Sequence, residues 1–68
     1  MEILINGKKE SLEDGMDILG LLNKKKIRPE MVAIELNDQV IHRNQYPEIT
    51  LKPNDRLEFI YYMGGGKC

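Results

Sequence analysis

Residues 2–26 read EILINGKKESLEDGMDILGLLNKKK and change from one apolar period to another partway along. The opening EILIN alternates its apolar side chains between two faces, which is typical of a strand. The pair Asn6 and Gly7 follows, and it is the strongest short hairpin signal because both residues tolerate positive φ. The stretch therefore predicts a hairpin whose second strand covers about residues 8–13.

Helical spacing begins after Gly15, where the apolar residues of ILGLL recur at intervals of three and four. Asp17 just before them is a candidate N-cap, so a helix is expected over about 17–26. Gly20 inside this helix indicates either close approach of a neighbour or a tolerated weakness. The lysines at 24–26 either complement the negative end of the helix dipole or form a docking patch for an acidic partner.

The rest of the chain supplies strands and turns. Four segments are expected as strands: MVAIEL at 31–36, QVI at 39–41, EITL at 48–51 and RLEFIYY at 56–62. HRNQYP at 42–47 is expected to form a short helical turn, and KPND at 52–55 a tight turn. A hairpin, a crossover helix and a further set of strands in so short a chain predict a two-layer α+β fold. A mixed sheet of four to five strands would pack on one main helix, as in the β-grasp or ubiquitin-like fold.

The chain has 68 residues, so one compact core must stabilise it. The apolar residues that match both periods should form this core between sheet and helix. They are Ile3, Ile5, Ile18, Leu21, Leu22, Val32, Ile34, Leu57 and Phe59.

Composition narrows the functional classes. With 10 Lys and Arg against 11 Asp and Glu, the chain lacks the basic surplus that binding to nucleic acid or to an anionic membrane requires. The chain has one cysteine and one histidine, too few for an internal disulfide or for a metal site built from several thiolates or imidazoles. The N-terminus has no signal-peptide or membrane-span pattern, so we expect a cytoplasmic protein, monomeric when free, whose partners are proteins.

The chain ends in YYMGGGKC, and its glycine run can pack nothing. We expect a domain over residues 1–63 and a flexible tail over 64–68. A thin tail of this kind can thread into another protein's active site, and its function would then reside in a backbone carboxylate. The alternative is a disordered end without consequence.

The last predicted strand has two faces. Leu57, Phe59 and Tyr61 share the face expected to meet the core. Ile60 and Tyr62 on the other face are candidates for an apolar partner-binding patch, with Met63 beside them, because aromatic residues are favoured at interface centres. Coverage by another strand or self-association would also explain that face.

Three stretches carry a resemblance to a known family: MEILING, VAIELNDQVIHRNQY and LKPNDRLEFIYYMGGG. Together they resemble the ThiS family of sulfur carrier proteins, small ubiquitin-like proteins of thiamine biosynthesis. The likeness covers residues 1–66. Its specific features are the element that ends in Arg43, the acidic turn at Asp55, and the closing pair Gly65 and Gly66.

This resemblance implies a carrier that catalyses nothing itself and binds no cofactor. A ThiF-like adenylating enzyme, related to ubiquitin-activating enzymes, would use ATP and magnesium to activate the carboxylate of Gly66. Sulfur would then replace AMP, and a ThiG-like thiazole synthase would accept the sulfur from the thiocarboxylate. Gly64 and Gly65 would thread the tail into both enzymes, and Arg43 would be a partner contact.

The sequence departs from the family pattern in two places. Lys67 and Cys68 follow the glycines, so either a JAMM-type peptidase removes them or the chemistry cannot occur at Gly66. Carriers with such extensions serve other pathways too, including synthesis of cysteine, homocysteine and siderophore-related products. His42 stands where a proline is expected before Arg43.

Other interpretations stay open. Cys68 would be a discarded processing residue, an idle exposed thiol, or a group that handles sulfur or forms a disulfide. The domain would otherwise be a regulatory or RNA-binding β-grasp module, or a protein modifier that forms isopeptide bonds as ubiquitin does.

Overall fold

The computed structural model of this protein describes residues 1–61. Its strands are β1 (Glu2–Ile5), β2 (Lys8–Ser11), β3 (Val32–Leu36), β4 (Gln39–Ile41) and β5 (Arg56–Tyr61). Its helices are α1 (Ile18–Lys24) and two short 3₁₀ turns, η1 (Pro29–Met31) and η2 (Arg43–Gln45). The predictions for the tail, from Tyr62 to Cys68, lie outside the described residues.

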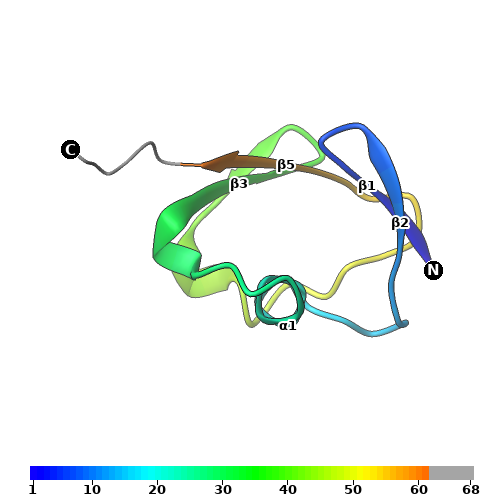
Figure 1. Ribbon diagram of the computed structural model, residues 1–68, viewed down its shortest axis with the longest axis horizontal. Helices are drawn as coiled ribbons and strands as arrows, with labels where there is room; N and C mark the ends of the chain where they lie inside the picture. The colour runs from blue at the N-terminus through cyan, green and yellow to red at the C-terminus, as the bar shows by residue number, and fades with distance from the viewer. Residues whose placement is uncertain (62–68) are drawn as a thin grey trace.

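The strands form one mixed sheet in the order β2-β1-β5-β3-β4. β1 and β5 are parallel, whereas the pairs β1·β2, β3·β5 and β3·β4 are antiparallel. Figure 1 shows the sheet as one layer and α1 as the other. The two-layer α+β architecture with a mixed sheet is therefore confirmed, and β5 lies at the centre of that sheet.

Both hairpins close on two residues at positive φ, as tight turns between twisted strands require. Asn6 and Gly7 have φ of 51° and 82° between β1 and β2, and Asn37 and Asp38 have 50° and 72° between β3 and β4. The first hairpin was predicted from sequence and is confirmed.

Its second strand is shorter than the predicted 8–13. Ser11 pairs with Glu2, the first residue of β1, so no partner strand remains for the residues that follow. Leu12 donates its N–H to the carbonyl of Met1 at 2.8 Å, its carbonyl accepts from the Met1 amino group at 2.7 Å, and its side chain enters the core.

The helix begins as predicted. Asp17 is its N-cap, and the carboxylate accepts a hydrogen bond from the N–H of Gly20 at 2.6 Å. A Cβ at Gly20 would lie 3.1 Å from that carboxylate oxygen and 3.5 Å from Cγ of Met16. The structure therefore supports the close-approach interpretation of Gly20.

The helix ends at Lys24, two residues before the predicted end. Lys26 adopts φ of 60°, and the N–H groups of Lys26 and Ile27 donate to the carbonyls of Asn23 and Leu22. This is the Schellman pattern, with lysine at the left-handed position that glycine usually occupies. Among the three lysines, Lys25 contacts Glu10 of β2 at 2.9 Å, which ties the helix end to the sheet. Nothing in the structure tests the docking interpretation of the lysine run.

The predicted strand at 48–51 is wrong. Its segment lies beside the start of α1, where Tyr46 and Ile49 offer their carbonyls to the N–H groups of Leu19 and Ile18. The first turn of a helix has N–H groups without intrahelical partners, so the carbonyls of this segment accept hydrogen bonds from the helix instead of pairing with a strand. Only an isolated bridge between Thr50 and Asp17 resembles strand pairing.

One strand boundary needs adjustment, and one predicted helical turn is confirmed. The predicted strand at 31–36 begins one residue later, because Pro29 starts a 3₁₀ turn that includes Met31. The helical turn predicted within 42–47 is confirmed as η2.

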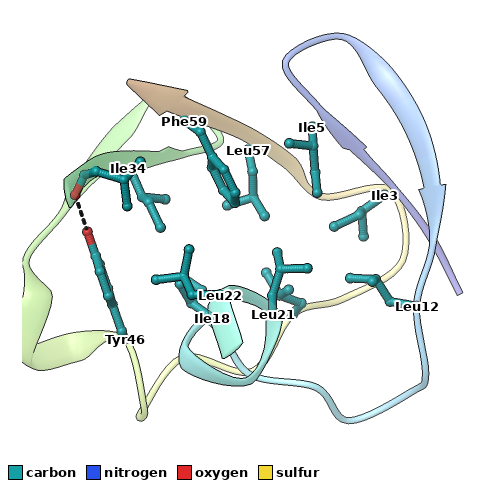
Figure 2. Close-up of a cluster of buried hydrophobic side chains, with 12 residues drawn as sticks. Ile3, Ile5, Leu12, Ile18, Leu21, Leu22, Ile34, Tyr46, Leu57 and Phe59 are labelled. Carbon is teal, nitrogen blue, oxygen red and sulfur yellow. Dashed lines mark hydrogen bonds between the residues drawn. The ribbon is translucent and has the colours of Figure 1, made fainter. Parts of the chain in front are cut away.

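The core lies between the sheet and α1, and all nine predicted core residues are buried. Figure 2 shows side chains of β1, β3 and β5 pointing toward those of α1. Three further buried residues were not predicted: Leu12, Tyr46 and Leu51. They come from connecting segments, where no strand or helix period exists to mark an inward side chain.

The helices of the described residues were also considered as possible membrane spans. Within residues 1–61, no helix combines the length and the apolar character that crossing a bilayer requires.

Candidate functional site

The tail continues from the central strand of the sheet. β5 lies between β1 and β3 and pairs with both, so its course through the domain is held from two sides. Gly66 is five residues beyond Tyr61, the last residue described. Because an extended residue spans at most about 3.6 Å, Gly66 can lie no more than about 18 Å from Tyr61.

An apolar patch occupies the sheet face that points away from α1. Ala33 is in register with Ile60, and Val40 is in register with Glu35, two residues further along the same face of β3. Ile60 is 49% exposed and Val40 is 65% exposed. We call Ala33, Val40 and Ile60 the outer patch. The sequence prediction that Ile60 faces outward is confirmed; its role in partner binding stays a prediction.

Two carboxylates border the outer patch. Glu35 and Glu58 are in register across β3 and β5 on the same outer face. Like charges directly opposite one another weaken a sheet. The border is therefore acidic on the side of the patch away from the end of β5.

Tyr61 differs from the other residues of its face. Leu57 and Phe59 are 1% and 5% exposed, whereas Tyr61 is 52% exposed. Its ring meets that of Phe59 edge to face, with centroids 6.4 Å apart. Alternation placed Tyr61 on the core face correctly, but it did not show that the core ends before Tyr61.

Arg43 lies beside the outer patch. A shallow pocket between η2 and the β3–β4 edge is lined by Arg43 and His42 together with Ala33 and Val40. Arg43 is exposed, and its place in η2 is fixed by backbone hydrogen bonds of that turn. Ala33 lines this pocket with Arg43 and is also in register with Ile60. Two of the predicted partner contacts, Arg43 and Ile60, therefore lie in one region of the surface.

His42 stands at the position where the sequence resemblance led us to expect a proline, and its backbone has a conformation that suits one. Its φ of −79° is close to the value that proline imposes. Its N–H, which a proline lacks, donates to Oε1 of Gln45 at 3.0 Å. The turn that carries Arg43 therefore forms with histidine at this position.

Asp55 positions the start of β5. Its carboxylate accepts from the N–H of Lys52 at 2.8 Å and from the side-chain amide of Asn37 at 3.1 Å. The side-chain oxygen Oδ1 of Asn37 in turn accepts from the N–H of Arg56 at 3.0 Å. This network joins the β3–β4 turn to the first residue of β5, so Asp55 holds the strand that carries the tail.

Asn6 is a residue whose role the sequence analysis missed. Its side-chain oxygen accepts from the N–H of Phe59 at 2.7 Å, and its side-chain nitrogen donates to the Phe59 carbonyl at 3.5 Å. The Asn-Gly pair predicted a turn, but nothing local could predict a contact with a residue 53 positions away.

The described residues offer little to a metal ion. Between Met1 and Tyr61, no group of three or more His, Cys, Asp or Glu side chains is arranged to hold one. What this part of the chain provides is a folded domain whose central strand leads into the tail, with the outer patch and Arg43 near the last residues of β5.

Comparison with known proteins identifies the family. The model of the ThiS family matches residues 2–66, nearly the whole chain. The chain belongs to the ThiS family. Members of the ThiS family are small sulfur carriers rather than enzymes, and the resemblance inferred from sequence is confirmed.

A solved structure agrees with this assignment. The crystal structure of the thiamine biosynthesis protein ThiS from Geobacter metallireducens is similar with a TM-score of 0.83 and 35% sequence identity. The match covers 97% of this chain and 100% of that one. The β-grasp fold predicted from sequence is therefore confirmed.

Two curated relatives differ greatly in length. A thiazole synthase of Magnetococcus marinus is 36% identical over 67 residues, which are 98% of this chain and 21% of the synthase. The chain thus spans about a fifth of that relative. The uncharacterized protein ycf40 of Pyropia yezoensis is 33% identical over 66 residues, 97% of this chain and 93% of that protein.

Proposed function

We propose that this ThiS family chain carries sulfur for thiamine biosynthesis on the carboxylate of Gly66, after removal of Lys67 and Cys68. The family match over residues 2–66 is the observation that carries this proposal, because it ends at Gly66. The fold supports it further, since the tail follows directly on β5, the central strand of the sheet.

The chemistry takes place in two steps on a partner enzyme. A ThiF-like adenylating enzyme, with ATP and magnesium, joins the Gly66 carboxylate to AMP and releases pyrophosphate. A sulfide-class nucleophile then attacks the carbonyl carbon, a C–S bond forms, and the bond to the AMP oxygen breaks. The product is a thiocarboxylate. The chain's own contribution is to present Gly66, with Gly64 and Gly65 leaving room for close approach of the enzyme.

A ThiG-like thiazole synthase is the proposed sulfur acceptor. The similarity of a segment of a thiazole synthase to this chain supports that choice over other sulfur pathways. In both enzymes the contacts would come from Ile60, Tyr62, Met63 and Arg43. Ile60 and Arg43 suit this role because both are exposed on neighbouring parts of one surface.

Removal of the last two residues needs a peptidase. As encoded, the carbonyl of Gly66 is an amide to Lys67 and has no carboxylate to activate. A JAMM-type peptidase would hydrolyse this bond and so remove Lys67 and Cys68. Cys68 would then be a discarded residue.

A comparison of two chain lengths tests the proposal. The encoded chain and a chain ending at Gly66 are each incubated with a ThiF-like enzyme, ATP, magnesium and sulfide, and intact masses are recorded. Only the shortened chain should gain the mass that replacement of one oxygen by sulfur produces. Equal conversion of both chains without cleavage, with sulfur at Cys68, would refute the assignment of Gly66.

A further inference from the structure

One edge of β5 stays open at Tyr61. Backbone groups of successive residues in a strand point alternately to the two neighbouring strands. On the β1 side, the Leu57 carbonyl accepts from the N–H of Asn6, and Phe59 bonds the Asn6 side chain through both its N–H and its carbonyl. Two residues further on, the N–H and carbonyl of Tyr61 therefore also point to the β1 side and away from β3.

β1 ends before it can reach this position. Its pairing with β5 stops at Ile5 and Leu57, and the chain then turns back through Asn6 and Gly7. The Asn6 amide offers one acceptor and one donor to Phe59, as the peptide groups of a further strand residue would. Along this side of β5, the hydrogen bonding given by the described residues ends with Asn6. In Figure 1, β5 continues beyond the β1–β2 hairpin.

We propose that an extended segment of the adenylating enzyme adds to the sheet at this edge and pairs with the N–H and carbonyl of Tyr61. Exposed strand edges bind extended peptides in this way, with main-chain hydrogen bonds that supply affinity. This inference rests on the proposed function, because it concerns the enzyme that activates Gly66.

Chain length places the enzyme at this edge. Gly66 lies at most about 18 Å from Tyr61, so an enzyme that encloses Gly66 comes within that distance of this edge. A strand added there would meet apolar side chains on both of its faces. Ile60 and Tyr61 point to opposite faces of the sheet and are 49% and 52% exposed. The fitting partner segment is therefore extended and apolar at alternate positions.

A pair of substitutions isolates the backbone contribution. Tyr61→Pro removes the N–H, and proline is tolerated where a strand N–H has no ladder partner. Tyr61→Ala removes the same ring but keeps the N–H, so it is the matched control. In chains ending at Gly66, Tyr61→Pro should bind the ThiF-like enzyme about tenfold more weakly than Tyr61→Ala. Both variants should unfold at similar temperatures, because this N–H does not pair with β3.

Amide hydrogen exchange of the unsubstituted chain gives a second reading that does not depend on a variant. The N–H of Tyr61 should exchange rapidly in the free protein and slowly when the enzyme is saturating. The N–H of Ile60, which faces β3, should be protected in both states.

Equal affinity of the two variants, or a Tyr61 amide that exchanges equally fast in the complex, would overturn strand addition. If the enzyme still activates Gly66 in that case, the proposed function survives. Failure of the enzyme to bind or activate the unsubstituted chain ending at Gly66 would overturn both.

Discussion

Deleting Gly66 from a chain that ends there is expected to abolish thiocarboxylate formation by the adenylating enzyme. The deletion withdraws the reactive carboxyl group by about 3.3 to 3.6 Å along an extended tail. A misplacement of about 1 Å can already cost about a hundredfold in rate. β5 cannot slide outward to compensate, because β3 on one side and β1 with Asn6 on the other hold it in register. Intact mass after incubation with ATP, magnesium and sulfide measures the product.

Two controls accompany this deletion. The chain that lacks Gly66 should unfold at the same temperature as the chain that ends at Gly66, since Gly66 lies beyond the domain core of residues 1–61. In the full chain, Cys68→Ser should still give product when the processing peptidase is present, because that residue is removed. Efficient product formation without Gly66 would show that another group accepts the sulfur.

Leu22→Ala should lower the free energy of unfolding by about 2 to 5 kcal/mol, a large part of the stability of so small a domain. Leu22 is fully buried in α1, facing the sheet, so truncation removes packing and leaves a cavity (Figure 2). The denaturation midpoint in urea measures the loss.

Lys24→Ala in the same helix is the matched control. Lys24 is exposed, so its truncation should change the unfolding free energy by no more than about 0.5 kcal/mol. An unchanged midpoint for Leu22→Ala would contradict the assignment of this residue to the core.

Much of the fold followed from local patterns. The Asn-Gly turn, the N-cap at Asp17 and the alternation of Leu57 with Phe59 each depend on neighbours in sequence, and each was predicted. The segment 48–51 looked like a strand by the same rules. Its backbone instead accepts a hydrogen bond from the first turn of α1, where N–H groups lack intrahelical partners. A contact between segments distant in sequence produces no local apolar period, so the sequence pattern could not predict it.

The candidate site was likewise predictable only where it depends on local sequence. The outward position of Ile60 followed from period two, whereas the proximity of Arg43 to Ala33 depends on how η2 lies against the sheet edge. The bridge from Asn6 to Phe59 joins residues near the two ends of the chain, so the Asn-Gly pair alone indicated only a turn. The termination of β1 beside an open β5 edge is visible only in the assembled sheet.

Transfer of labelled sulfur tests the central claim most directly. A chain ending at Gly66 is loaded with a heavy isotope of sulfur as its thiocarboxylate and supplied to a ThiG-like synthase with the remaining substrates of thiazole formation. We predict that the label appears in the thiazole ring and that the carrier returns to its carboxylate mass. Thiazole that forms with unlabelled sulfur, while the label stays on the carrier, would contradict the account.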